Sequence, residues 1–337
     1  MLPNIMLTYR CNLHCSYCFA NEFVNKQNTD ISIGNFLKAV RFITQTEQFI
    51  GIIGGEPTVH PGFQTMMELL IENPGVKGVR LFTNGILADR YIDVIMHPKV
   101  EVCVNCNSPK DIGEKTFDRL RQNLDLMMKR QSRANQVQLG TNLYSDDLDY
   151  TYITDLLQRY DQHILRTSLT VPDFSACGDG DVLEAFRKRK PFVLKFYRDL
   201  DKIGVLPFSD CNHPPYCIWT EEEKQWLEAF TAKYTDGPCK LVGTCSSCEP
   251  VIDILPDLQA VRCFGMSGFM KESIFDFESV RDLRRYFINE IDSAAYKLPA
   301  CEECRDCREW KTRRCTGGCI GYKSGRIRRS NEATARL

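Results

Sequence analysis

The sequence predicts a parallel α/β fold, a partial (β/α)6 TIM-like barrel, followed by a small cysteine-rich domain. Three observations carry this prediction. Short apolar runs alternate with amphipathic stretches of helical period through the first half of the 337 residues. Polar and turn residues follow the apolar runs. Eleven of the 17 cysteines lie from Cys211 onward, where continuous apolar patterning is largely lost.

Six apolar runs have the length of buried strands. The predicted strands are Asn4–Thr8, Phe49–Ile53, Val79–Thr83, Val100–Asn105, Gln136–Asn142 and Ile164–Thr170. The clearest helices predicted between them are Ile33–Thr46, Phe63–Ile71 and Lys115–Lys129. Strands that alternate with helices pair in parallel, and right-handed crossovers curve the sheet toward a barrel. Polar residues after the strands should therefore gather on one rim.

The chain is expected to have three regions. Residues 1–180 form the barrel, and residues 181–235 form a helical connection that is interrupted at Pro191 and has a capping box at Thr220. Residues 236–337 form the cysteine-rich domain, with one hairpin over Val251–Cys263. This last region has so little apolar patterning that we expect metal to stabilise it.

Composition narrows the class of protein. The apolar content of 43% and the net charge of −1 favour neither nucleic acid nor an anionic membrane as a partner. The chain has no apolar run of about 18 residues, and its start, MLPNIMLTYR, lacks a secretory signal. We therefore expect a cytoplasmic protein. In that reducing compartment, clustered cysteines are expected to bind metal rather than form disulfides.

The most informative stretch is CNLHCSYCFA, in which Cys11, Cys15 and Cys18 have the spacing C-x3-C-x2-C. A closed zinc site needs four protein ligands, and a redox pair needs only two thiols. Three thiolates on a four-iron cluster would leave one iron open to another ligand. The spacing favours such a cluster, with a zinc site and a redox pair as the alternatives.

A second motif, Gly54-Gly-Glu-Pro57, follows the second predicted strand. Its glycines allow close backbone approach to a ligand, and its carboxylate suits an ammonium, although a simple turn is the alternative. With the three cysteines and the aromatic Tyr17, this motif resembles the radical SAM superfamily. The resemblance implies a 4Fe–4S cluster whose open iron binds S-adenosyl-L-methionine (SAM). Reductive cleavage of SAM would give a 5′-deoxyadenosyl radical that abstracts hydrogen from a substrate.

The same resemblance implies which residues contact SAM. They are Tyr17, Gly54, Gly55, Glu56, Pro57, Asn84, Asn107, Ser108, Asn142 and Arg166. The last five are placed at predicted strand ends, where each could instead be a turn or cap residue. No catalytic residue is identified.

The stretch CEECRDCREWKTRRCTGGC resembles the SPASM extension of some radical SAM enzymes, which carries auxiliary 4Fe–4S clusters. The resemblance implies a first cluster on Cys245, Cys248, Cys263 and Cys319, with Cys239 as an alternative ligand. The second would use Cys301, Cys304, Cys307 and Cys315. SPASM extensions usually have one more cysteine, but none follows Cys319. Cys301 is expected to replace it; otherwise the second cluster is incomplete or absent. A zinc ribbon is the alternative.

The other cysteines have less distinctive surroundings. Cys211 and Cys217 are considered as further ligands or substrate-facing groups, with buried inert thiols as the default expectation. The same default applies to Cys103, Cys106 and Cys177.

The resemblance implies modification of a ribosomally synthesised peptide by cross-linking, thioether formation, epimerisation or side-chain oxidation. Flavodoxin or ferredoxin would donate electrons. Only ten residues precede Cys11, so either a separate protein binds the peptide's leader or this chain binds the peptide directly. One alternative is a small-metabolite substrate. Formylglycine formation, as in sulfatase maturases, is disfavoured because Phe264 stands where those enzymes have an aspartate. A non-enzymatic zinc or electron-transfer protein is disfavoured by the GGEP motif.

Overall fold

A computed structural model describes residues 2–18, 20–21, 23–132, 136–170, 182–209, 212, 214–237, 239, 241, 248–324 and 327. The chain divides into two compact units. The first comprises Met1–Gly140 and Pro250–Phe287, and the second comprises Thr141–Glu249 and Ile288–Leu337. This grouping differs from the contiguous regions 1–180, 181–235 and 236–337, which stay a sequence-based prediction.

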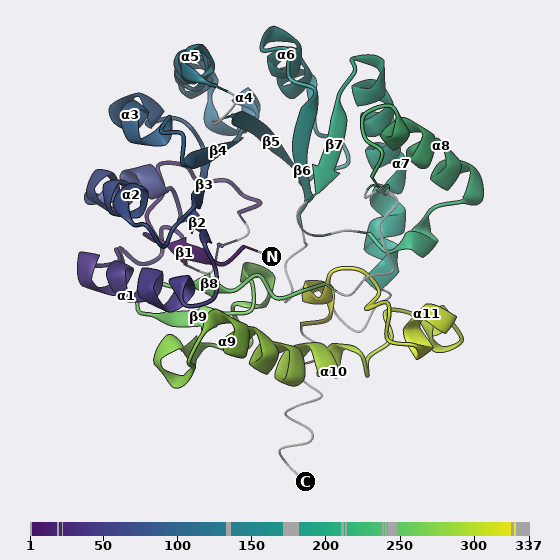
Figure 1. Cartoon of the computed structure of the whole chain (residues 1–337). Coiled ribbons are helices and arrows are strands. Elements are labelled where there is room, and N and C mark those ends of the chain that lie inside the picture. The colour runs from purple at the N-terminus through teal and green to yellow at the C-terminus, as the bar shows by residue number, and fades with distance from the viewer. Residues whose placement is uncertain are drawn as a thin grey trace. The chain divides into compact units, whose positions relative to one another are not determined.

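The first unit is built on parallel strands. In sequence order they are β1 (Asn4–Met6), β2 (Phe49–Ile53), β3 (Gly78–Thr83), β4 (Val100–Asn105) and the start of β5 (Val137–Leu143). Each pairs in parallel with the next. The connecting helices are α1 (Ile33–Thr44), α2 (Phe63–Glu72), α3 (Ile92–Ile95), α4 (Pro109–Ile112) and α5 (Glu114–Arg130). Helices α1, α2, α3 and α5 lie outside the curved strand array (Figure 1).

Local sequence explains these elements. Four of the five residues of β2 are buried, as expected for a parallel strand covered on both faces. Helix α1 begins at Ser32, whose Oγ accepts a hydrogen bond from the backbone N–H of Asn35 at 3.1 Å. It buries Phe36, Ala39, Val40 and Ile43 on one face. The predicted α/β fold class is thus confirmed, with most strand boundaries within a residue or two.

The predicted hairpin is also present, as β8 (Asp253–Ile254) antiparallel to β9 (Gln259–Val261). It belongs to the first unit, because β8 pairs in parallel with β1. Asn4 Nδ2 donates to Asp253 Oδ1 at 2.6 Å, and Asn4 N–H donates to Ile252 O at 2.9 Å. Strand β10 (Glu272–Ser273) then pairs antiparallel with β9, and helix α9 (Val280–Phe287) follows.

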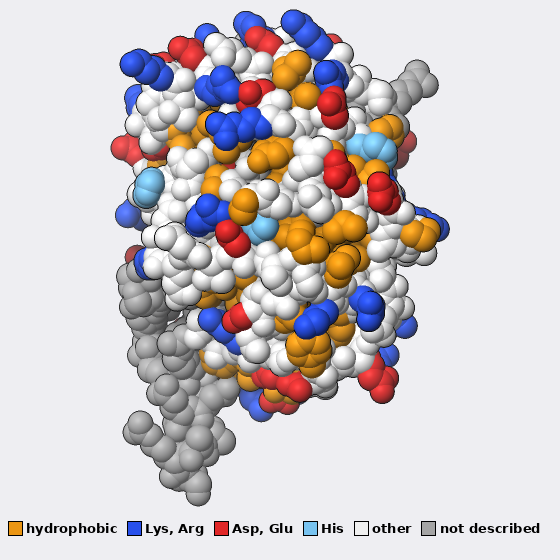
Figure 2. Space-filling view, turned by 90° about the vertical axis from the view of Figure 1, so that its left-hand side faces the viewer, with side chains coloured by type: hydrophobic (Ala, Val, Ile, Leu, Met, Phe, Trp, Pro, Cys, Tyr) orange, Lys and Arg blue, Asp and Glu red, His pale blue; other side chains and the backbone are white. Residues whose placement is uncertain are grey.

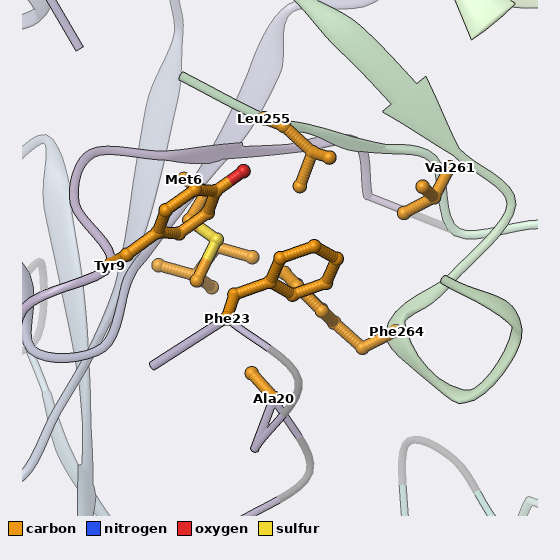
Figure 3. Packing of buried hydrophobic residues seen from close by; sticks show 8 residues of the cluster. Met6, Tyr9, Ala20, Phe23, Leu255, Val261 and Phe264 are labelled. Carbon is orange, nitrogen blue, oxygen red and sulfur yellow. The ribbon is translucent and has the colours of Figure 1, made fainter. Parts of the chain in front are cut away.

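A buried cluster joins this hairpin to the segment that follows the first cysteine motif. Tyr9 and Phe23 stack with ring centroids 5.2 Å apart. The cluster consists of Met6, Tyr9, Ala20, Phe23, Ile53, Leu255, Val261 and Phe264. Figure 3 shows the rings of Phe23 and Phe264 directed toward each other. Burial of these side chains fixes the chain just after Cys18.

The second unit contains β6 (Ile164–Leu169) paired in parallel with β7 (Leu206–Ser209), a strand that the sequence analysis missed. Its helices are α6 (Thr151–Arg159), α7 (Val182–Lys202), α8 (Glu221–Ala232), α10 (Ser293–Ala295) and α11 (Arg308–Lys311). Helix α7 continues through Pro191, so the expected interruption is wrong. The predicted capping box of α8 is confirmed: Thr220 N–H donates to Glu223 Oε2, and Glu223 N–H donates to Thr220 Oγ1.

The surface agrees with the near-neutral composition. On the face drawn in Figure 2, basic and acidic side chains are interspersed rather than segregated. Within the described residues, no helix has both the length and the apolarity needed to cross a bilayer.

The buried Asp253 generates a prediction about stability. Burial raises its pKa from the ordinary 3.8 to about 7, although Asn4 and the Phe264 N–H donate hydrogen bonds to its carboxylate. Between pH 3.8 and about 7, Asp253 is protonated in the folded chain but ionised in the unfolded chain. The contribution of this carboxyl group to stability therefore falls as pH rises. The slope is at most ~1.4 kcal/mol per pH unit for one proton. Asp253→Asn should remove this slope.

Urea unfolding of wild type and Asp253→Asn at matched pH values checks this. The stability of the wild type relative to the variant should decline from about pH 4 to 7 and then level off. A difference that is constant over this range would contradict the prediction.

Candidate functional site

The candidate site forms where β1 and β2 end. Because these strands are parallel neighbours, the segments that follow them leave the same edge of the sheet. Gly55 N–H donates to Thr8 O at 2.8 Å, and Glu56 N–H donates to Arg10 O at 2.9 Å. The backbone of the GGEP motif is therefore hydrogen-bonded to the chain that leads into Cys11.

Close approach at this point requires glycine. A Cβ built on Gly55 would lie 2.3 Å from Arg10 O and 3.1 Å from Cys11 Cβ. At Gly54 the nearest atom to such a Cβ would be Thr8 O at 3.2 Å, which is tight but less severe. The glycines of the GGEP motif thus allow the segment after β2 to lie against residues 11–18, which we call the cysteine loop.

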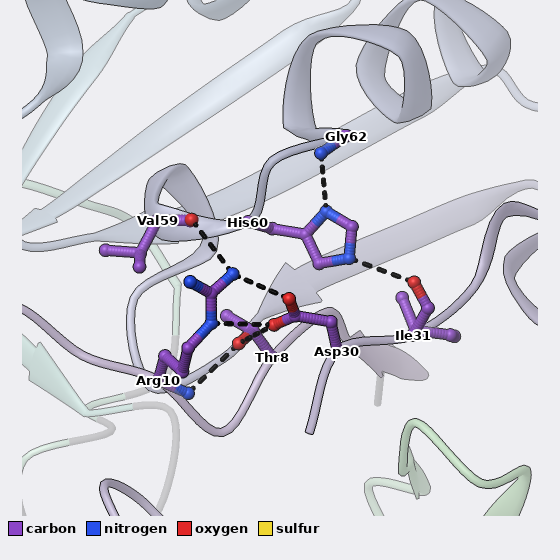
Figure 4. Close-up of polar contacts among 7 residues, drawn as sticks. All are labelled: Thr8, Arg10, Asp30, Ile31, Val59, His60 and Gly62. Carbon is purple, nitrogen blue, oxygen red and sulfur yellow. Dashed lines mark hydrogen bonds and ion pairs between the residues drawn. The ribbon is translucent and has the colours of Figure 1, made fainter. Parts of the chain in front are cut away.

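An ion pair anchors the start of this loop (Figure 4). Arg10 donates to Asp30 from Nε at 3.0 Å and from Nη2 at 2.6 Å, and also to Val59 O at 3.3 Å. Thr8 Oγ1 donates to the same carboxylate at 2.6 Å. Burial alone would raise the pKa of Asp30, but the bonds from Thr8 and Arg10 lower it overall. A bidentate pair of this kind fixes direction as well as charge.

His60 has a structural role next to the GGEP motif. Gly62 N–H donates to Nδ1 at 2.9 Å, so Nδ1 is an acceptor and Nε2 carries the hydrogen that it donates to Ile31 O at 2.9 Å. Burial lowers the pKa of His60, consistent with this neutral tautomer. Both ring nitrogens are therefore used to connect segments of the fold (Figure 4).

Asn25 holds the cysteine loop from the other side, and the sequence analysis missed it. Cys11 N–H donates to Asn25 Oδ1 at 2.8 Å, while Asn25 Nδ2 donates to Leu13 O at 3.0 Å. The backbone of Asn25 has φ 58°, a left-handed conformation that asparagine tolerates better than most residues. The sequence signal was only an asparagine seven residues after Cys18.

The three predicted cluster ligands lie close together at this loop. Burial, together with the charges of Glu56, Cys15 and Cys18, raises the pKa of Cys11 to about 12. Burial also raises the pKa values of Cys15 and Cys18. Leu13 N–H donates to Cys11 Sγ at 3.3 Å, the kind of bond that tunes a cluster's potential. Because these thiols resist ionisation alone, a positively charged group is needed to hold them as thiolates.

Three thiols in one loop match the donor set of a four-iron cluster with one open iron. Among the residues that the structure describes, no three His, Cys, Asp or Glu side chains are close enough to hold one metal ion. A four-iron cluster needs a wider arrangement, because each thiolate binds a different iron. Cys11, Cys15 and Cys18 would hold such a cluster and leave one iron for SAM.

Glu56 is buried, with only 1% of its surface exposed. Its Oε1 accepts from Thr58 N–H at 3.1 Å, Thr58 Oγ1 at 2.6 Å and Thr83 Oγ1 at 2.7 Å, and its Oε2 accepts from Asn84 N–H at 2.7 Å. Burial raises its pKa, against these bonds. The carboxylate joins the ends of β2 and β3. An ammonium would have to compete with four protein donors for it.

Other predicted SAM contacts also lie around the cysteine loop. Asn84 Nδ2 donates to Asn12 Oδ1 at 2.7 Å, and Tyr17 OH donates to Asn107 Oδ1 at 2.6 Å. The ends of β3 and β4 thus reach this loop. Ser108 caps α4, since its Oγ accepts from Lys110 N–H at 3.2 Å. Pro57 begins a short 3-10 helix, Pro57–Val59.

Two predicted SAM contacts belong to the second unit. Asn142 is the penultimate residue of β5, and Arg166 lies within β6 rather than at its end. The roles of all the predicted SAM contacts stay predictions.

The second unit also holds the residues predicted for the second auxiliary cluster. Cys301 Sγ lies 3.4 Å from Cys304 Sγ, and Cys315 Sγ accepts from Gly317 N–H at 3.2 Å. Gly317 has φ 78°, and a Cβ there would lie 2.3 Å from Ala300 Cβ, so glycine is needed in this loop. Burial raises the pKa of Cys315, against the backbone N–H groups of Gly317 and Gly318 and the charge of Lys323, which lower it. The buried Lys323 amino group lies 4.7 Å from the Trp310 ring centroid.

The residues predicted for the first auxiliary cluster do not all belong to the same unit of the chain. Cys245 lies outside the described residues. Cys263 belongs to the first unit, whereas Cys248 and Cys319 belong to the second. The thiol of Cys239 contacts Thr231 Oγ1 at 3.0 Å and Leu227 O at 3.3 Å, next to helix α8. This ligand set stays a prediction.

Cys103 and Cys106 are buried, as expected, and burial raises the pKa of Cys106. Cys177 and Cys211 lie outside the described residues. Cys217 is exposed, so the default expectation of a buried thiol is wrong for it.

Comparison with known proteins adds three findings. Residues 5–149 match the model of the radical SAM superfamily. The chain is 30% identical over 93 residues to GTP 3′,8-cyclase of Chlorobaculum tepidum, covering 27% of this chain and 28% of that enzyme. It is 32% identical over 91 residues to molybdenum cofactor biosynthesis protein moc-5 of Caenorhabditis elegans, covering 26% and 15%. The match thus spans little more than a quarter of the first relative's length and less than a sixth of the second's.

The fold resembles that of Streptococcus suis SuiB over a much longer stretch. The SuiB structure bound to S-adenosylmethionine has a TM-score of 0.61 and 14% identity, covering 95% of this chain and 73% of SuiB. The SuiB structure bound to precursor peptide SuiA gives the same score and identity, with 72% of SuiB covered. At this identity the likeness establishes the fold.

Gly55→Ala should disrupt the cysteine loop, because the added methyl group meets Arg10 O. Overpacking of this kind costs about 1–3 kcal/mol. We expect a lower urea midpoint and loss of up to about four irons per chain after anaerobic reconstitution, one cluster's content. Gly34→Ala is the control, since its Cβ meets nothing closer than 3.8 Å. Wild-type iron content in Gly55→Ala would contradict the prediction.

Asn25→Gly should weaken the same loop by a different route. Glycine keeps the left-handed backbone but removes both side-chain hydrogen bonds, a loss of about 1–3 kcal/mol in all. Iron should therefore leave the loaded protein faster under a chelator, followed through its visible absorbance. If the release rate equals that of wild type, Asn25 does not hold the loop.

Proposed function

The chain belongs to the radical SAM superfamily through residues 5–149, and from this premise we propose that its substrate is a ribosomally synthesised peptide. Enzymes of this superfamily use SAM and a 4Fe–4S cluster. When bound, these groups supply a 5′-deoxyadenosyl radical that removes a hydrogen atom from the substrate. The protein's own residues position that chemistry.

The geometry around the cysteine loop supports the cluster-binding part of the proposal. Cys11, Cys15 and Cys18 offer three thiolates, while Asn25 and the Arg10–Asp30 pair hold both sides of the loop. Gly55 allows the segment after β2 to lie against the loop backbone. Asn84 and Asn107 connect the next two strand ends to it. The site can therefore hold a cluster rigidly at the carboxyl ends of the strands, where barrel enzymes bind substrates.

The extent of the fold likeness supports a peptide substrate. SuiB, similar in fold over 95% of this chain, was solved with its precursor peptide. Because the likeness to SuiB covers 95% of this chain, it extends into the cysteine-rich C-terminal segment. We propose that the modified peptide carries a cross-link, a thioether, an epimerised α-carbon or an oxidised side chain.

A nucleotide is the second candidate substrate, because the similar curated proteins include GTP 3′,8-cyclases. That likeness extends over about a quarter of the chain, which is why we favour the peptide. Formylglycine formation is less favoured. Phe264, the position of the aspartate in sulfatase maturases, is packed in the buried cluster.

The remaining parts of the proposal concern partners and location. We propose flavodoxin or ferredoxin as the electron donor and the cytoplasm as the compartment. Precursor recognition is assigned either to a separate leader-binding protein or to this chain directly. A low-potential donor suits a reaction that begins with one-electron reduction of a cluster.

Substrate-dependent SAM cleavage tests the proposal. Reconstituted protein is incubated anaerobically with SAM and dithionite, together with either candidate precursor peptides encoded near its gene or GTP. We expect 5′-deoxyadenosine to rise with a peptide, and that peptide to show a changed mass. The variant lacking Cys11, Cys15 and Cys18 should form none. If omission of the peptide leaves product undiminished, or GTP alone is converted, the peptide proposal fails.

A further inference from the structure

Cys217 lies on a short 3-10 helix, Tyr216–Ile218, in the second unit. Among the described cysteines it alone is classed as exposed. Its position is fixed by neighbouring contacts. Lys190 Nζ donates to Ile218 O at 3.1 Å and to Glu223 Oε2 at 3.0 Å, which connects the 3-10 helix and the start of α8 to helix α7.

The same stretch of α7 contacts the C-terminal cysteine region. Phe186, one helical turn before Lys190, packs against Tyr322 with ring centroids 4.7 Å apart. Arg187 Nη2 lies 3.7 Å from Glu303 Oε1, the residue before Cys304. Residues 186–190 of α7 therefore contact both the Cys217 helix and the segment of Cys301 to Cys319.

The electrostatic surroundings of Cys217 agree with this placement. Although the residue as a whole is exposed, burial raises the pKa of the Cys217 thiol, and the charges of Cys315, Cys304 and Cys307 also raise it. These three are the C-x2-C-x7-C cysteines predicted for the second auxiliary cluster. All four cysteines belong to the same unit.

We propose that Cys217 is the fourth ligand of a 4Fe–4S cluster held by Cys304, Cys307 and Cys315. Four thiolates are the ligand set of a complete cluster. Cys217 would then take the place of the cysteine that is missing after Cys319. This assignment differs from the expectation that Cys301 fills the position. Cys301 Sγ lies 3.4 Å from Cys304 Sγ, and the two would have to separate before each could bind its own iron.

The proposal rests on the auxiliary-cluster part of the proposed function, but not on the identity of the substrate. Iron content and thiol protection are the same whether the enzyme acts on a peptide or a nucleotide. A failed substrate assay therefore leaves the ligand assignment standing, and a failed ligand assignment leaves the substrate proposal standing.

The first test needs no substitution. Reconstituted full-length protein and metal-free protein are treated briefly with iodoacetamide under anaerobic conditions, and alkylation is read for each cysteine by peptide mass spectrometry. We expect Cys217 to be alkylated in the metal-free protein and protected several-fold in the loaded protein. Equal alkylation of Cys217 in both samples, at full iron content, overturns the proposal.

The second test compares Cys217→Ala with Cys217→Ser and Cys301→Ala. Cys106→Ala is the control for loss of a buried thiol that is not a ligand. We expect Cys217→Ala to lose about four irons per chain, or to keep them with an altered EPR signal after dithionite reduction. Cys217→Ser, which keeps an oxygen ligand, should lose less. Wild-type iron and EPR in Cys217→Ala, or losses confined to Cys301→Ala, overturn the proposal.

Discussion

The candidate site depends on one close backbone contact, between the segment after β1 and the segment after β2. With no Cβ at Gly55, the carbonyl of Arg10 can accept the Glu56 N–H. This contact places the cysteine loop beside the buried Glu56 carboxylate, which connects onward to Thr83 and Asn84. The ends of three neighbouring strands are thus joined by hydrogen bonds around the loop.

Much of the fold could be predicted because parallel strands covered on both faces appear as continuous apolar runs. The three cysteines of the loop could also be recognised as candidate ligands, because the spacing of ligands in such a motif is local in the sequence. The roles of Asn25 and of the Arg10–Asp30 pair could not be predicted, because a single asparagine or arginine in a sequence does not indicate which group it will contact. The pairing of β1 with β8 joins residues 249 positions apart, and no local pattern encodes such a contact.

The basic run Arg187-Lys-Arg-Lys190 shows the same limit. Such a run of like charges is typical of a solvated face, yet Arg189 donates to the carbonyls of Leu143, Tyr144 and Thr170, and Lys190 donates to Ile218 O. Long basic side chains can cover apolar surface and still reach carbonyl groups at their tips. These contacts order the surroundings of Cys217, whose spacing from the other cysteines is too long to form a motif.

The pairing of β1 with β8 has a consequence for synthesis on the ribosome. The cysteine loop is translated first, but Leu255, Val261 and Phe264, which pack behind it, emerge far later. With Asn4 and Asp253 249 residues apart, at ~5–20 residues per second the nascent loop waits tens of seconds for its cover. Until then the loop lacks the packing that fixes the chain just after Cys18, so its final order depends on a segment that is translated much later.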